Sequence, residues 1–494
     1  MVEAHLSILL VVVPLLAAPV TALLPGSRLP WSMTMFVTLL CLVMSYSILA
    51  DVAQGNHIHY ELGGWAPPWG IAYEIDGLNA LVAFTICLVG SLVTVYAFYS
   101  VPADIPEDKH ALFYAAYLLC FLGLLGMTMT GDIFNVFVFL EISSLSTYAL
   151  VSMGRNRQAL SASFQYLILG TIGATFFLVG IGLAYAATGS LNMADLAQRL
   201  AESRHEHTVQ TALGFIFVGM ALKAAMFPLH QWLPRAYTYA PIMVSAFLAG
   251  TATKVAVYVV VRTTFSVFTV AYAITTILDE LLIIFGSIAV VYGAIQAMRQ
   301  TTIKPLLAWS SLSQIGYLMF GIGLLSATGL IATIVHLFNH AIIKTGLFMA
   351  AGILLYQTGT LRISELKGIG RQMPLTFWAI VIAGLSLIGV PGTVGFISKW
   401  YLVQAAVEQQ IWWVAGVVVL GSVLAIGYVW KIVETLYFQP DKQPVEYAGP
   451  SRELVLPLIL PVWILALACI YLGLDTQITV GAAESAAREF GLIP

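Results

Sequence analysis

Charged residues are scarce in this chain. Only 9% of its 494 residues are Asp, Glu, Lys or Arg, while 60% are hydrophobic and the mean hydropathy is +0.91. A soluble domain has about 25% charged residues, so this composition indicates a lipid-embedded protein from which no soluble domain can be separated. The net charge of −3 and the scattered basic residues also exclude a basic nucleic-acid-binding surface.

Cysteine is equally rare, and its placement excludes several kinds of chemistry. Each of the four cysteines (Cys41, Cys87, Cys120 and Cys469) lies within an apolar run, without disulfide or metal-ligand spacing. The sequence also has no Cys₄ cluster motif, haem-ligand pair or nucleotide-binding loop. We therefore predict a chain with no cofactor, no metal and no redox or hydrolytic centre, that is, not an enzyme in its own right.

Apolar runs of about 20 residues, separated by short polar breaks, predict membrane-spanning helices. The N-terminus lacks a basic region, so we interpret the first run as a retained span and not as a cleaved signal. We predict an all-α polytopic membrane protein with about fourteen spans. They cover residues 4–24, 31–51, 76–100, 110–129, 132–153, 160–187, 209–232, 241–263, 271–298, 303–325, 327–356, 374–404, 411–438 and 453–475.

The distribution of basic residues predicts the orientation, because cytoplasmic loops are enriched in Lys and Arg. With the N-terminus outside, the inside segments hold twelve basic residues: Arg28, Lys109, Arg155, Arg157, Arg235, Arg299, Lys304, Arg362, Lys367, Arg371, Lys442 and Arg452. The outside segments hold four: Arg199, Arg204, Arg262 and Arg488. We therefore predict that both termini lie outside the cell membrane of a prokaryote.

Two of the predicted spans are interrupted. Pro228 and Pro234 break the seventh, and Pro391, Gly392 and Gly395 break the twelfth. An offset of five spans reverses direction across the membrane, and paired broken helices are typical of inverted repeats with a midplane site. We predict four parts: residues 1–109 with the first three spans, repeats 110–264 and 265–440, and residues 441–494 with the last span and the tail.

Three ionisable residues lie deep in the first half. Glu141 follows Asp132 by nine residues, a rise of about 13 Å, and Lys223 and Lys254 are central in their spans. A charge at mid-membrane costs roughly 3 kcal/mol, so it is rarely kept without a function. We predict a Glu141–Lys223 charge pair with Lys254 as the next proton carrier. The alternatives are a carboxylate neutralised by protonation and lysines that reach the interface.

The eleventh span carries His336, His340 and Lys344 at i, i+4 and i+8, which places them on one helical stripe. A histidine pair at this spacing binds zinc in some proteins, but no third ligand or HExxH pattern accompanies it. Lone buried histidines usually serve packing. We favour a proton path, because histidine exchanges protons near neutral pH.

Lys399, after the second broken helix, completes the series. Glu141, Lys223, Lys254, Lys344 and Lys399 together cost on the order of 15 kcal/mol, which argues for one polar line along the membrane plane. Other polar residues have plainer interpretations. Lys431 is interpreted as structural, Ser310, Ser311, Ser313 and Gln314 as water sites or helix contacts, and Glu74, Asp76, Asp279 and Glu280 as interfacial charges.

Several segments together resemble the antiporter-like subunits shared by Mrp-type cation/proton antiporters, respiratory complex I and membrane-bound hydrogenases. They are TGDIFNVFVFLE, LKAAMFPLHQWLPRAY, the Lys254 segment, LAWSSLSQIGY, HLFNHAIIKTGLF and GVPGTVGFISKW. Within the family, the chain is most similar to the D-type subunits of Mrp antiporters, by the sequence GDIFNVFVFLE in the fifth span, the chain length and a lysine at 399.

This resemblance implies a proton-translocating subunit of a Na⁺ (or K⁺/Li⁺)/H⁺ antiporter, assembled with A-, B-, C-, E-, F- and G-type subunits. It implies a charge pair of Glu141 and Lys223, a central axis of Lys254, His336, His340 and Lys344, and Lys399 as the terminal proton carrier. Two alternatives stay open: a proton-pumping subunit of a complex I-like or hydrogenase complex, and a membrane scaffold with inert buried charges.

Overall fold

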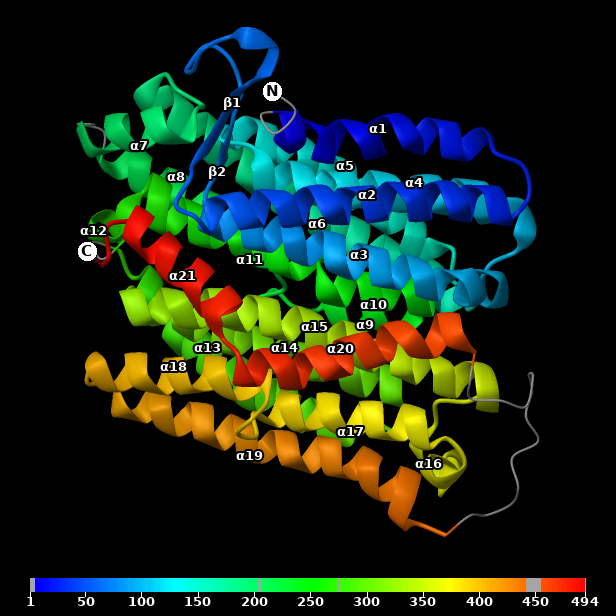
Figure 1. The fold of residues 1–494 in the computed structure, drawn as a ribbon. Coiled ribbons are helices and arrows are strands. Elements are labelled where there is room, and N and C mark those ends of the chain that lie inside the picture. The colour runs from blue at the N-terminus through cyan, green and yellow to red at the C-terminus, as the bar shows by residue number, and fades with distance from the viewer. Residues whose placement is uncertain (1–4, 203–205, 274–275, 441–454, 494) are drawn as a thin grey trace.

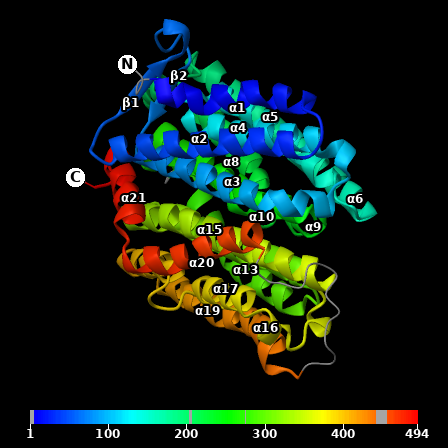
Figure 2. The ribbon, with the colours of Figure 1, turned by 45° about the vertical axis from the view of Figure 1, so that its right-hand side comes forward.

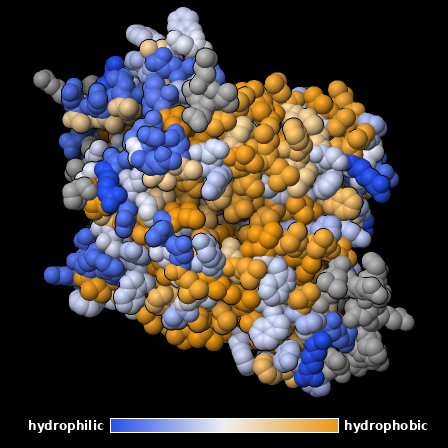
Figure 3. Space-filling model, in the orientation of Figure 1, coloured by the Kyte–Doolittle hydropathy of each residue, from blue (hydrophilic) through white to orange (hydrophobic). Residues whose placement is uncertain are grey.

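The computed structural model describes residues 5–202, 206–273, 276–440 and 455–493, and nearly all of them are helical. The long helices lie side by side, as Figures 1 and 2 show. On the face shown in Figure 3, hydrophobic residues form a broad central area and hydrophilic residues gather towards the two ends of the helices. This distribution is that of a protein spanning a bilayer.

The chain starts with three long helices, α1 (Leu6–Leu23), α2 (Arg28–Val52) and α3 (Gly77–Asp104). Between α2 and α3 lies an antiparallel hairpin of β1 (Ile58–Glu61) and β2 (Ala72–Ile75), in which Ile58 pairs with Ile75. The prediction of an all-helical chain omits this hairpin. The hairpin lies at one end of the bundle, next to both chain termini (Figure 1).

The next region corresponds to the first predicted repeat. Its helices are α4 (His110–Met129), α5 (Ile133–Ser152), α6 (Arg157–Thr188), α7 (Met193–Glu202), α8 (Glu206–Lys223), α9 (Trp232–Tyr239), α10 (Ile242–Gly250) and α11 (Ala252–Arg262). The break predicted in the seventh span separates α8 from α9. The eighth span, predicted as continuous over 241–263, is also broken, because the backbone of Thr251 is not helical (φ −127°, ψ −60°).

The remaining helices form the second region and the C-terminal tail. They are α12 (Thr269–Ala273), α13 (Leu278–Arg299), α14 (Ile303–Gly323), α15 (Ala327–Thr358), α16 (Ile369–Gln372), α17 (Pro374–Ile388), α18 (Val394–Glu408), α19 (Trp412–Val433), α20 (Leu456–Leu474) and α21 (Gln477–Glu489). The predicted break in the twelfth span separates α17 from α18. Gly389 ends α17 at φ 91°, a conformation that residues with a Cβ rarely adopt.

Eleven helical segments of the described chain are long and apolar enough to cross a membrane. The other three predicted spans correspond to the broken pairs α8–α9 and α17–α18 and to α14, whose polar residues lower its hydropathy. The predicted polytopic architecture is therefore confirmed. The division into inverted repeats stays a prediction, although α4, α5, α6 and α8 pack in the same sequential order as α13, α14, α15 and the α17–α18 pair.

Two segments form the centre of the bundle. The apolar stretch of α15 that could span a membrane is completely buried and that of α10–α11 is 94% buried, whereas that of α19 is only 33% buried. In Figures 1 and 2, α15 lies between the N-terminal helices and α17–α20. The predicted central axis is thus carried by the two segments that lipid does not reach.

Both termini lie at the same end of the bundle, as an even number of spans requires (Figure 1). Which side of the membrane this end faces stays a prediction. Two residues of the predicted charge count are not exposed to solvent as loop residues are: Lys304 is buried near the start of α14, and Arg262 forms a largely buried ion pair at the end of α11. Arg204, Lys442 and Arg452 lie outside the described residues.

Candidate functional site

Lys223 is the last residue of α8, at the point where the helix breaks. Its ammonium group donates to the hydroxyls of Ser144 (2.6 Å) and Tyr148 (3.1 Å), four residues apart on α5. The carbonyl of Leu222, which the break frees, accepts a hydrogen bond from the indole of Trp232 (2.8 Å). Lys223 is 7% exposed, so its charge is held by side-chain hydroxyls inside the bundle.

The expected direct pair of Glu141 and Lys223 is not formed in the structure. Glu141 interacts with Lys223 electrostatically, but the ammonium is hydrogen-bonded to Ser144 and Tyr148 instead. The Oε1 atom of Glu141 is buried and has no hydrogen-bond partner among the described residues. Beside Lys223 and Ser144 is a cavity of about 30 Å³, which is enough for a water molecule.

Lys254 lies one turn after the break between α10 and α11. Its ammonium donates to the carbonyl of Ala249 and to the hydroxyl of Thr253 (3.3 Å). Because Thr251 interrupts the helix, the last carbonyls of α10 need another donor, and Lys254 supplies it. Sequence reasoning missed this break, and the only local signal is the Gly250–Thr251 pair, whose residues are poor helix formers.

The three residues of the α15 stripe lie on one side of the helix and face different partners. Lys344 donates to Ser310 Oγ (2.5 Å) and to the Leu307 carbonyl (3.0 Å), both on α14. The rings of His336 and His340 have centroids 5.8 Å apart, and both nitrogens of His340 are buried without a partner in the described chain. The N–H donor and the acceptor nitrogen of the His340 imidazole are therefore both unused in this structure.

Lys399 lies in α18, facing the end of α17. Its ammonium donates to the carbonyls of Leu387 (3.1 Å) and Ile388 (2.7 Å) and to Ser422 Oγ (3.1 Å). It therefore caps the carbonyls that the break leaves without helical partners. Negative partial charge at a helix C-terminus favours a cation, so α17 stabilises the ammonium form.

Two side chains connect the α15 stripe to Lys399. Ser398 Oγ lies 2.8 Å from His336 Nδ1, and Ser398 directly precedes Lys399. The ring of Tyr317 lies 5.6 Å from the His336 ring and 4.9 Å below the Lys399 ammonium. On the other side, Lys254 interacts electrostatically with His336, His340 and Lys344.

The structure thus brings the seven sequence-predicted residues into one buried series. Six of them are less than 9% exposed, while Glu141 is intermediate and its Oε1 atom is buried. Lys223 and Lys254 are not in direct contact in the described chain; the small cavity beside Lys223 is also lined by Ala252 and Ala256, which lie two residues on either side of Lys254 in α11. Sequence reasoning missed the hydroxyl partners Ser144, Tyr148, Ser398 and Ser422, although Tyr148 follows Glu141 by seven residues on the same helical face.

Some polar residues have structural roles. Lys431 donates to the carbonyls of Met298 (2.9 Å) and Gln300 (2.7 Å) at the end of α13, in agreement with its interpretation as structural. Ser313 joins α14 to the Val290 carbonyl of α13. Ser310, by contrast, belongs to the site as the acceptor for Lys344.

The profile of a membrane family described as NADH:quinone oxidoreductase/Mrp antiporter matches residues 130–425. The chain belongs to this family. The matched region holds all seven residues of the buried series. Its relatives include both branches of the family, so membership alone does not choose between an antiporter and a redox-driven complex.

Curated relatives come from both branches. The N-type subunit of the NADH-quinone oxidoreductase of Desulforudis audaxviator is 38% identical, over 96% of each chain. The D-type subunit of the Na⁺/H⁺ antiporter of Alkalihalophilus pseudofirmus is 30% identical, over 85% of this chain and 84% of the relative.

Two solved structures are similar over nearly the whole chain. A chain of the archaeal membrane-bound sulfane sulfur reductase has a TM-score of 0.89 at 32% identity, covering 98% of each chain. A chain of the Mrp complex of a Dietzia species has a TM-score of 0.88 at 25% identity, covering 100% of this chain and 99% of that one. The family resemblance inferred from the sequence is confirmed, and the relatives support a multi-pass subunit of a larger membrane complex.

Proposed function

We propose that this chain is the proton-translocating membrane subunit of a multisubunit monovalent cation (Na⁺, K⁺ or Li⁺)/H⁺ antiporter. Protons enter beside Glu141 and Lys223, move along Lys254, His340, Lys344 and His336, and leave through Lys399. The other subunits, by the resemblance of the A, B, C, E, F and G types, complete the cation pathway in a prokaryotic cell membrane.

The observation that carries this proposal is the series of buried ionisable groups. Each charge at mid-membrane costs roughly 3 kcal/mol, and here they lie in sequence across the centre of the bundle and not scattered over its surface. The series also includes hydroxyl groups: Ser398 Oγ, for example, lies 2.8 Å from His336 Nδ1, and a hydroxyl both donates and accepts a hydrogen bond.

The lysines suit proton transfer because the carbonyls and hydroxyls that accept their hydrogen bonds are already in place, whether the lysine is charged or neutral. At each broken helix a lysine or an indole satisfies the freed carbonyls, so loss of a proton changes the charge without opening the helix ends. A neutral lysine amine still has two N–H groups to donate, whereas arginine stays protonated in proteins.

The test replaces lysine by arginine, which keeps the positive charge and the hydrogen-bond donors but does not release a proton. In everted vesicles with the assembled complex, we expect Lys223→Arg, Lys254→Arg and Lys399→Arg each to lower cation-driven pH change on the order of 100-fold. Lys431→Arg is the matched control, because Lys431 only binds carbonyls at the end of α13. Wild-type rates in the first three variants, at normal complex assembly, would rule out this site.

A second candidate is a proton-pumping subunit of a redox-driven complex. It is favoured by the 38% identity to the N-type subunit of an NADH-quinone oxidoreductase and by the similarity to the sulfane sulfur reductase complex. The buried series would carry protons in the same way, but electron transfer elsewhere in the complex would drive it. The neighbouring genes distinguish the two, and so does proton movement driven by a cation gradient without an electron donor, which only the antiporter shows.

A further inference from the structure

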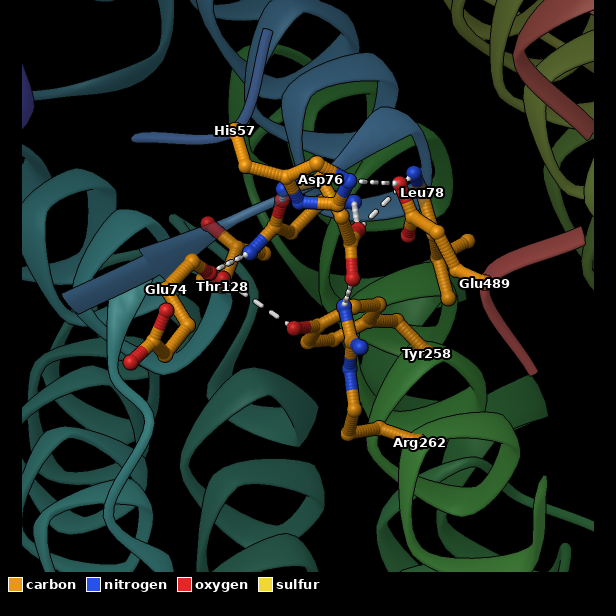
Figure 4. A network of polar contacts seen from close by, with 9 residues as sticks. His57, Glu74, Asp76, Leu78, Thr128, Tyr258, Arg262 and Glu489 are labelled. Atoms are coloured by element: carbon orange, nitrogen blue, oxygen red, sulfur yellow. Dashed lines mark hydrogen bonds and ion pairs between the residues drawn. The ribbon is translucent and has the colours of Figure 1, made fainter. Parts of the chain in front are cut away.

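A second polar cluster lies at the end of the bundle that holds both termini. It consists of His57, Asp76, Tyr258, Arg262 and Glu489, and we call it the terminal cluster (Figure 4). Asp76 Oδ1 caps the first turn of α3, while its Oδ2 lies 2.5 Å from Arg262 Nη2. Glu489 of α21 lies 3.3 Å from His57 Nε2. Asp76 is thus part of a fixed network and not a plain interfacial charge.

The terminal cluster surrounds a cavity of about 410 Å³, lined also by Glu74, Ser266 and Met193. Exposure decreases from its mouth to its floor. The side chains of His57 and Glu489 are 66% and 17% exposed, that of Arg262 is 12% exposed, and Tyr258 is 3% exposed. A cavity of this size holds several water molecules, so the aqueous phase reaches the buried end of α11.

Tyr258, at the floor of this cavity, stands one helical turn after Lys254 in α11. Lys254, Tyr258 and Arg262 stand at i, i+4 and i+8 of α11 and form one stripe, with steps of about 6 Å along the helix. The Arg262 guanidinium lies 5.6 Å from the centre of the Tyr258 ring. The Tyr258 hydroxyl donates to the carbonyl of Thr128 (3.1 Å). The stripe repeats the spacing of His336, His340 and Lys344, but it runs towards the surface.

The groups that face the cavity include one suited to proton exchange. Burial and the nearby Asp76 carboxylate raise the pKa of Glu489 to about 8, against the opposing effect of Arg262. Glu489 therefore changes its charge near neutral pH. The other titratable or charged groups around the cavity are His57, Glu74 and the ion pair itself.

We propose that the terminal cluster is an access route for protons, connecting Lys254 with the aqueous phase at the end of the bundle that holds the termini. Tyr258 is the relay between the cavity and Lys254. Arg262, held by Asp76, places a guanidinium between the mouth of the cavity and Tyr258, where it opposes the passage of metal cations. This proposal rests on the proposed function, and it adds an opening in the middle of the buried series to those at its two ends.

The first test is Tyr258→Phe, which removes one hydroxyl and keeps the ring. In vesicles with the assembled complex we expect proton movement to slow about fivefold, the change in rate that corresponds to the free energy of one ordinary hydrogen bond. Tyr185→Phe, at a tyrosine that is 51% exposed on the lipid-facing side of α6, is the matched control and is expected at the wild-type rate. A wild-type rate in Tyr258→Phe together with an inactive Lys254→Arg overturns the route and leaves the proposed function standing. An active Lys254→Arg overturns the proposed function itself.

The second test measures water access without transport. The four native cysteines are buried, so a single introduced thiol reports on its own site. We expect Ser266→Cys and Tyr258→Cys to react with a small, membrane-impermeant thiosulfonate added from the side of the termini. Ser45→Cys, at a fully buried position, is the unreactive control. No reaction at either cavity position would overturn the route, whatever the effect of the substitutions on transport.

Discussion

The two broken helices hold their lysines in different ways. At the first break, the indole of Trp232 satisfies the freed carbonyl of Leu222, and Lys223 bonds to two hydroxyls close to Glu141. At the second break, Lys399 itself satisfies the carbonyls of Leu387 and Ile388. Which group caps the helix end therefore decides what the lysine is free to bind.

This difference indicates different tasks for the two lysines. The Lys399 ammonium is stabilised by backbone carbonyls that cannot move away or change charge. The Lys223 ammonium is stabilised by two hydroxyls and, electrostatically, by the Glu141 carboxylate, whose charge a proton can remove. We infer that Lys223 belongs to the switchable end of the buried series and Lys399 to the end with fixed electrostatics.

The largest expected difference concerns stability. Lys399→Met leaves two buried carbonyls without a donor, whereas Lys223→Met leaves the Leu222 carbonyl bonded to Trp232. Both variants lose a buried ammonium group, and the comparison is made at a pH at which Glu141 is protonated, so that no unpaired carboxylate is left beside residue 223. We expect Lys399→Met to be less stable than Lys223→Met by about 1–3 kcal/mol, the cost of unsatisfied buried polar groups. Thermal unfolding of the two purified complexes measures this difference, and equal unfolding temperatures would contradict the capping role.

A second comparison concerns pH. Glu141→Gln removes the carboxylate that acts on Lys223 and keeps the side-chain shape. We expect the rate of cation-driven proton movement to fall about tenfold at its optimum and the optimum to move along the pH axis. Ser422→Ala, which removes the neutral side-chain partner of Lys399, is the counterpart and is expected to keep the optimum in place. The comparison fails if the two variants have the same pH profile.

Much of this architecture follows from the sequence, because lipid allows few alternatives. Spans, breaks at Pro228 and Pro391 and buried lysines all come from patterns that a bilayer makes costly to violate. The distance between Glu141 and Lys223 does not follow from such patterns, because rotamers and cavities are set by the packing of several helices. The non-helical Thr251 was missed for the same reason.

The terminal cluster could not be predicted from the sequence either. Asp76 and Arg262 are 186 residues apart in the chain, and each alone resembles an ordinary charge at the end of a helix. Only the packing of α3, α11 and α21 brings them together with Glu489. Hydropathy predicts how deep a residue lies in the membrane, but it does not predict which helix ends are neighbours in the fold.

The smallest expected effect concerns an exposed pair, which gives a scale for the buried one. His59 of β1 lies 2.6 Å from Glu74 of β2, and this hydrogen bond and charge raise the pKa of His59 above its usual 6.5. The pair's contribution is therefore complete below pH 6.5 and is lost as the pH rises through the higher, folded-state pKa. Because both side chains are nearly half exposed, solvent limits this contribution to about 0.5 kcal/mol. His59→Gln should accordingly remove a small fall in the unfolding temperature of the complex between neutral and alkaline pH. A pH-dependent fall in unfolding temperature that is the same in wild type and His59→Gln would contradict this contribution of the exposed pair.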